Sequence, residues 1–254
     1  MFVDTHCHLD DKKFQDINKV VASYLEVGVE RVITIGCDNK SSLESKNLSE
    51  NFSSVYFASG FHPSEADKFT LEGLEIIKNL CEHEKCVAVG EIGLDYHWEP
   101  FDLAKQKEIF EAQIQLANQY RLPISVHSRD ATKDVLDILR ATKPENCGVM
   151  HCFSGSKETA KILLDLGFYL GFGGTVTFNN ATNLKEVASY CPLDRILTET
   201  DSPYLAPHPF RGSVNEPKNI PVIASCLAFL KGESLETIKN FVYQNAKRLF
   251  YKLK

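Results

Sequence analysis

Residues 124–173 have the sequence ISVHSRDATKDVLDILRATKPENCGVMHCFSGSKETAKILLDLGFYLGFG, in which three short apolar runs alternate with two longer amphipathic stretches. The runs at 124–127, 148–151 and 168–173 are rich in β-branched, aromatic or glycine residues, which is typical of β-strands. We expect the two stretches between them to be helices. A strand, a helix and a further strand in this order favour a right-handed βα unit whose strands are parallel.

The same alternation extends over the whole chain of 254 residues. Strands are predicted at residues 2–6, 31–36, 55–60, 87–91, 124–127, 148–151, 168–173 and 195–200. Apolar residues recur at helical spacing between and after them, for instance at Leu103, Phe110, Ile114 and Ala117 and at Leu235, Ile238, Val242, Ala246 and Leu249. Repeated βα units in a chain of this length predict an α/β protein with a single (β/α)8 TIM-barrel domain over residues 1–254. An open doubly wound sheet is the less favoured alternative.

The composition is that of an ordinary globular protein, with 43% hydrophobic and 24% charged residues. The formal net charge of −6 argues against a broad basic surface for nucleic acid, although bound divalent cations could still capture an anionic substrate. The eight cysteines include no C-x-x-C pair, so we expect reduced thiols. The first residues do not resemble a secretion signal, and the apolar runs are too short to span a membrane. The sequence therefore predicts a soluble, cytoplasmic protein with no membrane association, and nothing in it indicates an obligate protein partner.

Histidine and carboxylate residues gather at the predicted C-terminal ends of the strands, where (β/α)8 enzymes place their active sites. They are His6 and His8 after the first strand, His62 after the third, Glu91 at the fourth, His127 at the fifth, His151 at the sixth, and Glu199 and Asp201 at the eighth. Five of the eight histidines fall at these positions, which is far more than a random distribution would place there. Imidazole and carboxylate together are the ligands of zinc, manganese and related ions. The pattern indicates a metal centre in the mouth of the barrel.

Two features of this set favour bound cations over ordinary buried polar groups. His6 and His8 are two residues apart, so both imidazoles point to the same side of an extended strand, while Cys7 faces the helices. Glu91 ends an apolar strand, where a carboxylate is costly to bury without a cation, and its two oxygens could bridge two metals. We therefore predict two divalent metal ions (zinc, magnesium or manganese) held by His6, His8, Glu91, His127, His151 and Asp201.

Seven blocks of the sequence resemble the TatD family of metal-dependent deoxyribonucleases, within the wider amidohydrolase-like barrel hydrolases. The blocks are DTHCHLD (4–10), FHPSEA (61–66), VGEIGLDY (89–96), LPISVHSRDA (122–131), HCFSGS (151–156), ETDSPYLAPHPFRGSVNEP (199–217) and NAKRLF (245–250). They occur in family order over nearly the full length, and the combination is far more specific than the HxH pair alone. Phe61 is a mild departure, since the family pattern leads us to expect a smaller residue there. It would alter the rim of the pocket and leave the metal ligands unchanged.

The resemblance implies a two-metal barrel enzyme that hydrolyses DNA phosphodiester bonds, often as a 3′-to-5′ exonuclease. Position by position, the ligands of one metal would be His6, His8 and Asp201, and those of the other His127 and His151, with Glu91 as the bridge. We expect a water activated by the two metals to attack phosphorus. Glu91 and Asp201 would be the catalytic residues, and Asp201 would orient the water or accept its proton.

Five further residues are candidates for contacting the substrate: His62, Arg129, Glu199, Tyr204 and Arg211. Arg129 has the planar fork that suits phosphate, with an ion pair to Asp130 as the alternative. Tyr204 offers a stacking face for a base, with an ordinary packing role as the favoured alternative. Glu199 lies two residues before Asp201 on the same face, so it could instead support a metal ligand or form a strand-end ion pair.

The partner that these features imply is DNA, or RNA, as a single strand or at its ends. A metallohydrolase of the same barrel class that acts on a small ester, amide or phosphotriester is the main alternative, because the fold does not fix the substrate. A metal-dependent binding protein without activity is a third hypothesis. Tyr96 and Trp98 would line the rim of the site or only pack its loop.

Overall fold

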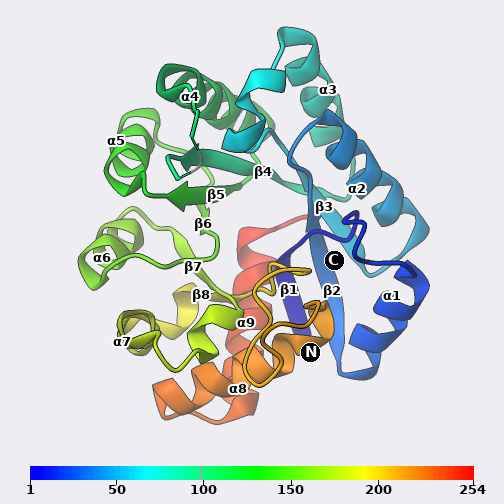
Figure 1. Ribbon diagram of the computed structural model, residues 1–254, viewed down its shortest axis with the longest axis vertical. Coiled ribbons are helices and arrows are strands. Elements are labelled where there is room, and N and C mark those ends of the chain that lie inside the picture. The colour runs from blue at the N-terminus through cyan, green and yellow to red at the C-terminus, as the bar shows by residue number, and fades with distance from the viewer. Residues whose placement is uncertain (98) are drawn as a thin grey trace.

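Eight parallel strands form one sheet in the computed structural model, which describes residues 1–97 and 99–254. The strands are β1 (Phe2–Cys7), β2 (Val29–Ile35), β3 (Val55–Ser59), β4 (Cys86–Asp95), β5 (Ile124–Arg129), β6 (Gly148–Met150), β7 (Tyr169–Phe172) and β8 (Ile196–Thr198). Each strand pairs in parallel with the next one in the chain. All eight predicted strands are present, and the (β/α)8 barrel prediction is confirmed (Figure 1).

Side-chain and backbone hydrogen bonds join β8 to β1 and bring the two ends of the sheet together. The Thr5 hydroxyl donates to the Thr198 carbonyl oxygen at 3.1 Å. Beyond the end of β8, the Asp201 amide donates to the His6 carbonyl oxygen at 2.9 Å, and the His8 amide donates to the Ser202 carbonyl oxygen at 2.7 Å. The seam therefore fixes the residues after β8 directly beside those at the end of β1.

A ring of helices surrounds the strands (Figure 1). The α-helices are α1 (Ile17–Glu26), α2 (Asn39–Asn51), α3 (Leu71–Cys81), α4 (Leu103–Tyr120), α5 (Thr132–Thr142), α6 (Lys157–Asp165), α7 (Thr182–Tyr190), α8 (Ile220–Lys231) and α9 (Leu235–Leu249), and short 3-10 helices lie at η1 (Pro63–Lys68), η2 (Gly174–Thr177), η3 (Leu193–Arg195) and η4 (Pro217–Asn219). Side chains cap several N-termini, as Asp102 does for α4 and Ser234 for α9. Such caps satisfy backbone amides that have no partner within the helix.

The apolar core has two layers. The larger layer fills the space between the strands and the surrounding helices. The smaller layer lies inside the barrel, where residues such as Val3, Ile33 and Tyr56 pack against Leu249 and Phe250 at the end of the chain. Figure 1 shows α9 crossing behind the strands. The C-terminal helix therefore closes the barrel at the N-terminal ends of the strands.

Two strand boundaries differ from the sequence prediction and affect the site. β4 continues to Asp95 instead of ending at Glu91, and all ten of its residues are buried. Gly93 permits this extension, because a Cβ there would collide with the carbonyl oxygen of His127 on β5. β8 ends at Thr198, so Glu199 and Asp201 lie on the segment that follows the strand.

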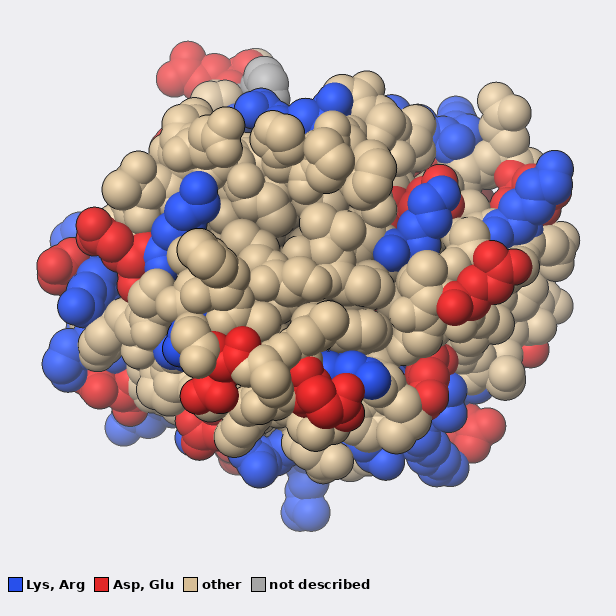
Figure 2. All heavy atoms as spheres, turned by 90° about the horizontal axis from the view of Figure 1, so that it is seen from below, with Lys and Arg blue, Asp and Glu red and all other residues tan. Residues whose placement is uncertain are grey.

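The distribution of surface charge and the state of the cysteines are those expected from the sequence composition. On the face seen in Figure 2, viewed from the side of α8, acidic and basic side chains are interspersed and form no broad basic surface among the described residues. All eight cysteines are free thiols, as predicted. Within residues 1–97 and 99–254, every helix is too short or too polar to cross a membrane.

Candidate metal centre

Glu91 lies at the centre of the barrel mouth, with only 3% of its surface exposed. Its Oε2 atom is 3.4 Å from Nε2 of His6 and 3.9 Å from Nε2 of His8. Its Oε1 atom is 2.8 Å from Nδ1 of His127 and 3.0 Å from Nε2 of His151. The two oxygens of one carboxylate therefore face two separate pairs of imidazoles.

Asp201 completes the first of these groups. Its Oδ1 atom lies 3.4 Å from Nε2 of His8 and 3.8 Å from Nε2 of His6. The residue has a left-handed backbone conformation, with φ of 53°, which aspartate tolerates better than most residues. One oxygen and two ring nitrogens thus lie close enough together to hold a cation.

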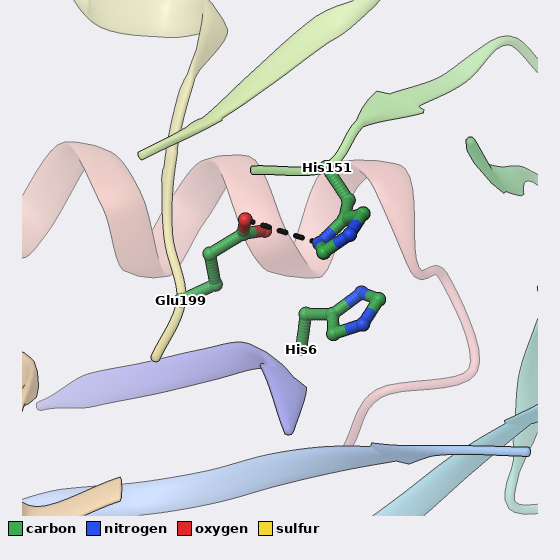
Figure 3. A group of neighbouring side chains, drawn as sticks. All are labelled: His6, His151 and Glu199. Atoms are coloured by element: carbon green, nitrogen blue, oxygen red, sulfur yellow. Dashed lines mark ion pairs between the residues drawn. The ribbon is translucent and has the colours of Figure 1, made fainter. Parts of the chain in front are cut away.

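The second group consists of Glu91, His127 and His151, whose ligand atoms also lie within metal-binding distance of one another. It adjoins the first group directly. The rings of His6 and His151 stack with centroids 3.7 Å apart and planes 14° apart (Figure 3). The structure thus brings together all six predicted metal ligands, from β1 and the residue after it, β4, β5 and the segments after β6 and β8. Two of the groups match the division that the family resemblance implies, and three overlapping groups add Cys37, Glu199, or His62 with Asp95.

The ring nitrogens that face away from the centre are also held. Nδ1 of His8 donates to the Ile35 carbonyl oxygen at 3.2 Å, and Nδ1 of His6 lies 3.4 Å from the Ser125 hydroxyl. Asp95 Oδ2 forms a hydrogen bond of 3.0 Å with Nε2 of His127. Glu199 Oε1 lies 3.3 Å from Nδ1 of His151 as an ion-pair contact, without hydrogen-bond geometry (Figure 3). Partners of this kind fix the orientation and tautomer of metal-binding histidines.

Burial and charge set the protonation of the centre. Burial favours the neutral form of Glu91, but the charge of the neighbouring His151 and the hydrogen bonds from His127 and His151 hold its pKa well below its usual value. Burial, together with the charge of His151, lowers the pKa of His6. Burial lowers the pKa values of His8, His127 and His151, but the neighbouring carboxylates, and Cys37 beside His8, raise them above the usual value. A divalent cation must therefore displace protons from these three imidazoles when it binds.

An unsatisfied atom supports the same interpretation. Nε2 of His6 is buried and has no hydrogen-bond partner among the described residues, although it points toward Glu91 and Asp201. A buried polar atom without a partner is costly, and a cation between these groups would satisfy it. The residues present therefore fit one metal on each side of Glu91.

Three polar residues at the centre were missed from the sequence. Asp95 was placed beyond the end of β4, yet it is the residue that holds His127. Cys37 lies 3.9 Å from Nδ1 of His8 and 4.0 Å from Oε2 of Glu91. A lone cysteine after a strand gives no signal in a single sequence, whereas the acidic residue in VGEIGLDY was visible within a block already singled out.

Asp4 is the third missed residue. It is fully buried at the seam and accepts hydrogen bonds from the amides of His6 at 3.2 Å and Thr200 at 3.0 Å. Burial raises its pKa to about 7, although the hydrogen bonds from Thr200 oppose the rise. Asp4 therefore ties the backbone of His6 to the backbone that leads into Asp201.

The candidate substrate contacts divide into two sets. His62 and Glu199 lie at the centre itself: Nε2 of His62 is 3.6 Å from Glu91 Oε1, and Glu199 accepts a hydrogen bond from the Cys152 amide in addition to its contact with His151. The Ser64 amide donates to Nδ1 of His62 at 3.1 Å, and burial lowers the pKa of His62 to about 4. His62 is therefore neutral, and its proton lies on Nε2, facing the centre.

Arg129, Tyr204 and Arg211 lie further out. Arg129 is exposed at the end of β5. Tyr204 is 44% exposed and donates to Asp11 Oδ2 at 2.7 Å, with the Lys13 ammonium 4.3 Å from its ring centroid. The guanidinium carbon of Arg211 lies 4.1 Å from the ring centroid of Phe178.

The contacts of Tyr96 support the packing alternative. The Tyr96 hydroxyl donates to Asp134 at 2.9 Å, and its ring stacks on Phe101 with centroids 5.3 Å apart. Trp98 lies outside the described residues.

Three cavities open around the centre. The first, of about 400 Å³, has His8, His62, Glu91 and Tyr204 in its walls, and the carboxylates of Asp10, Asp11 and Glu65 also line it. The second, of about 560 Å³, extends from His127, His151 and Asp201 toward α7. The third, of about 440 Å³, lies over α5 and α6 and shares Arg129 with the second. An extended substrate could therefore lie on both sides of the metal centre.

The sequence model of the family described as "TatD related DNase" matches residues 3–251 of this chain. The chain belongs to the TatD family. Among TatD relatives, the metal-dependent hydrolase YabD of Bacillus subtilis is 45% identical over 98% of this chain and 99% of its own length. The metal-dependent hydrolase YcfH of Escherichia coli is 41% identical over 98% of this chain and 95% of its own length. The crystal structure of YjjV, a TatD homologue from Escherichia coli, matches with a TM-score of 0.95 at 32% identity, covering 98% of each chain.

These findings confirm the resemblance drawn from the sequence blocks. As a member of the TatD family, the protein is a metal-dependent hydrolase. The names of YabD and YcfH state no substrate, so the bond that this enzyme cleaves must be inferred from its own site.

Proposed function

We propose that this TatD protein hydrolyses phosphodiester bonds of DNA, as a 3′-to-5′ exonuclease acting on single-stranded ends. The observation that carries the proposal is the position of Glu91, whose two oxygens face two imidazole pairs, an arrangement suited to two cations that together stabilise an in-line displacement at a phosphodiester. The description of the matching family as a DNase supports the choice of DNA.

The proposed ligands of the first metal are His6, His8 and Asp201, and those of the second are His127 and His151, with Glu91 shared. Bound divalent cations in such a site supply Lewis-acid chemistry, which lowers the pKa of water and neutralises charge on phosphate oxygens. The orienting partners of the four rings keep their ligand nitrogens directed at the centre. We leave zinc, magnesium and manganese as the candidates, since the mixed imidazole and carboxylate set suits each of them.

The remaining polar groups have distinct roles in the proposed reaction. Asp201 uses Oδ1 toward the two histidines, so its Oδ2 is the atom that orients the attacking water and takes its proton. His62 donates from Nε2 to a non-bridging oxygen of the phosphate. Arg129, at the wall between two cavities, grips a neighbouring phosphate through its guanidinium.

An end-labelled single-stranded oligonucleotide tests this proposal. The chelated protein is reloaded with zinc, magnesium or manganese and incubated with DNA labelled at the 5′ end. We expect a ladder that shortens progressively from the 3′ end, and no cleavage in chelator. Matched RNA and double-stranded DNA measure the preference for sugar and strand.

The alternatives give different results in the same experiment. Turnover of a small ester, amide or phosphotriester without cleavage of DNA would contradict the proposal and support the other metallohydrolase. Binding of DNA without turnover of any substrate would support a binding protein. Asp201→Asn is the control, because it keeps the size of the side chain and removes the proposed proton acceptor.

A further inference from the structure

The second cavity has a composition that the metal centre alone does not explain. Its inner end is formed by His127, His151 and Asp201, and its outer end lies between the segment after β7 and the start of α7. Its volume of about 560 Å³ is within the range of small-molecule sites in proteins. The two proposed metals therefore explain the residues at the inner end of this cavity and leave those at its outer end without an assigned role.

Charge distinguishes this cavity from the first one. The first cavity carries Asp10, Asp11 and Glu65 in addition to the centre. In the described lining of the second cavity, Asp201 of the metal centre is the one carboxylate, and Arg129 contributes a positive charge. Outside the metal centre, the side chains of the second cavity therefore favour an anionic ligand more than those of the first.

Phe178 provides a flat apolar wall in the outer part of the cavity. Its ring is half-buried, and the Arg211 guanidinium carbon lies 4.1 Å from the ring centroid. A cation over one face of the ring holds the aromatic side chain in place beside the cavity that Phe178 lines.

Amide groups stand close to this wall. Asn180 and Asn183 both line the cavity. The side-chain amide nitrogen of Asn183 donates to the Gly155 carbonyl oxygen at 3.0 Å, which leaves its Oδ1 to accept a hydrogen bond. Leu184 and Leu205 supply apolar surface beside them. An aromatic face with amide donors and acceptors at its edge is the environment that recognises a nucleobase.

We propose that the outer part of the second cavity is a nucleobase subsite, which holds the base of the nucleotide whose phosphate lies at the metal centre. The base stacks on Phe178, its edge meets Asn180 and Asn183, and Arg129 lies beside the backbone. The assignment rests on the proposed phosphodiesterase function and specifies its substrate as a nucleotide chain, in contrast to a simple phosphate ester.

Two chromogenic phosphodiesters separate the base from the metal chemistry. Thymidine 5′-(4-nitrophenyl phosphate) carries a base, and methyl 4-nitrophenyl phosphate does not. In Phe178→Ala we expect kcat/KM for the thymidine ester to fall about tenfold, as for the loss of one base–aromatic stack. For the methyl ester we expect a change of less than about twofold. Equal effects on both esters, or no effect on either, would overturn the subsite.

Further variants control for effects of Phe178→Ala that do not arise from the loss of base stacking. Phe229→Ala removes a phenylalanine that is 85% exposed on α8, and we expect it to leave both esters unchanged. If Phe178→Ala fails to fold, Phe178→Leu keeps apolar bulk without the ring and should show the same selective loss. Arg211→Ala should show a smaller loss, also confined to the thymidine ester.

A binding measurement tests the nucleobase subsite separately from the proposed hydrolysis of DNA. Thymidine 5′-monophosphate and 2-deoxyribose 5-phosphate are titrated into the metal-loaded protein by calorimetry. Tighter binding of the nucleotide, lost in Phe178→Ala, supports the subsite even if no phosphodiester is hydrolysed, in which case only the proposed function fails. Equal affinity for the two ligands overturns the subsite, even if DNA is cleaved.

Discussion

The two ends of the barrel are filled in opposite ways. At the N-terminal ends of the strands, Val3, Ile33 and Tyr56 pack against Leu249 and Phe250, and the apolar surfaces are fully buried. At the C-terminal ends, the interior holds carboxylates and imidazoles; Glu91, His6 and His151 are buried, and His8, His127 and Asp201 are partly buried. Nε2 of His6 has no hydrogen-bond partner among the described residues. Apolar burial stabilises the first end, whereas polar groups at the second are costly unless a ligand satisfies them.

This difference indicates that the closed end mainly determines stability and the open end mainly determines activity. Removing a charge at the mouth should reduce activity without unfolding the metal-free protein. Removing apolar volume at the closed end should reduce stability without changing the chemistry. The following predictions test that separation.

The largest effect is expected for Glu91→Gln, which keeps the shape of the side chain and removes its charge. Activity on DNA at saturating metal should fall about a thousandfold or more, because both proposed metals lose a shared ligand. The metal-free protein should stay folded, but its free energy of unfolding should fall, because glutamine leaves the imidazoles of His127 and His151 without their ion-pair partner. Turnover assays and urea denaturation in chelator measure the two quantities, with the exposed Glu145→Gln as the control. Near-normal turnover would rule out the proposed role of Glu91.

Phe250→Ala tests the closed end. Phe250 is buried under the barrel, so the cavity left behind should lower the free energy of unfolding by about 3–5 kcal/mol. The activity per folded molecule should stay unchanged at a temperature where the variant is folded. Thermal denaturation and kcat/KM on the same samples check both statements, and a selective loss of activity would show that the two ends are coupled.

The sequence was sufficient to predict the strands but not their irregularities. Apolar runs identified all eight strands, and alternation within β1 correctly placed His6 and His8 on one side. Val3 and His6 both face the interior, although they are three residues apart, because the pairing of β1 with β2 shifts between Asp4 and Cys7. Neighbouring strands determine such a shift, so a single sequence does not reveal it.

A shift in strand pairing also explains why the sequence analysis missed Asp95. The pairing of β4 with β5 shifts between Val89 and Ile92, and the strand continues for four residues beyond Glu91. The sequence prediction ended β4 at Glu91, so the carboxylate that holds His127 was assigned to the loop. The residue types at the strand ends predicted the metal centre. The residues that contact the proposed ligands on the side away from the centre could be identified only from the folded structure.

A smaller effect is expected for Asp95→Asn, which keeps the contact with His127 and removes its negative charge. The affinity for the metal on the His127 side should fall about 10–100-fold, which is the usual effect of replacing a residue that hydrogen-bonds to a metal-binding histidine. Competition with a fluorescent chelator measures the two binding constants. We expect the affinity on the His6 and His8 side to change little, and an equal loss on both sides would contradict the division of the centre.

The smallest effect is expected for Tyr204→Phe, at the exposed rim. The variant loses the hydrogen bond to Asp11, and we expect the free energy of unfolding to fall by about 1 kcal/mol or less. KM for DNA should change less than about threefold, because the ring face is kept. A large fall in kcat would instead place the Tyr204 hydroxyl among the reacting groups.

Anomalous diffraction from crystals soaked in Mn²⁺ tests the central claim most directly, since it locates the cations without reference to activity. The account predicts two peaks, one beside His6, His8 and Asp201 and one beside His127 and His151, with an oxygen of Glu91 directed at each. Absence of both peaks at saturating Mn²⁺, or strong peaks only elsewhere on the protein, would contradict it.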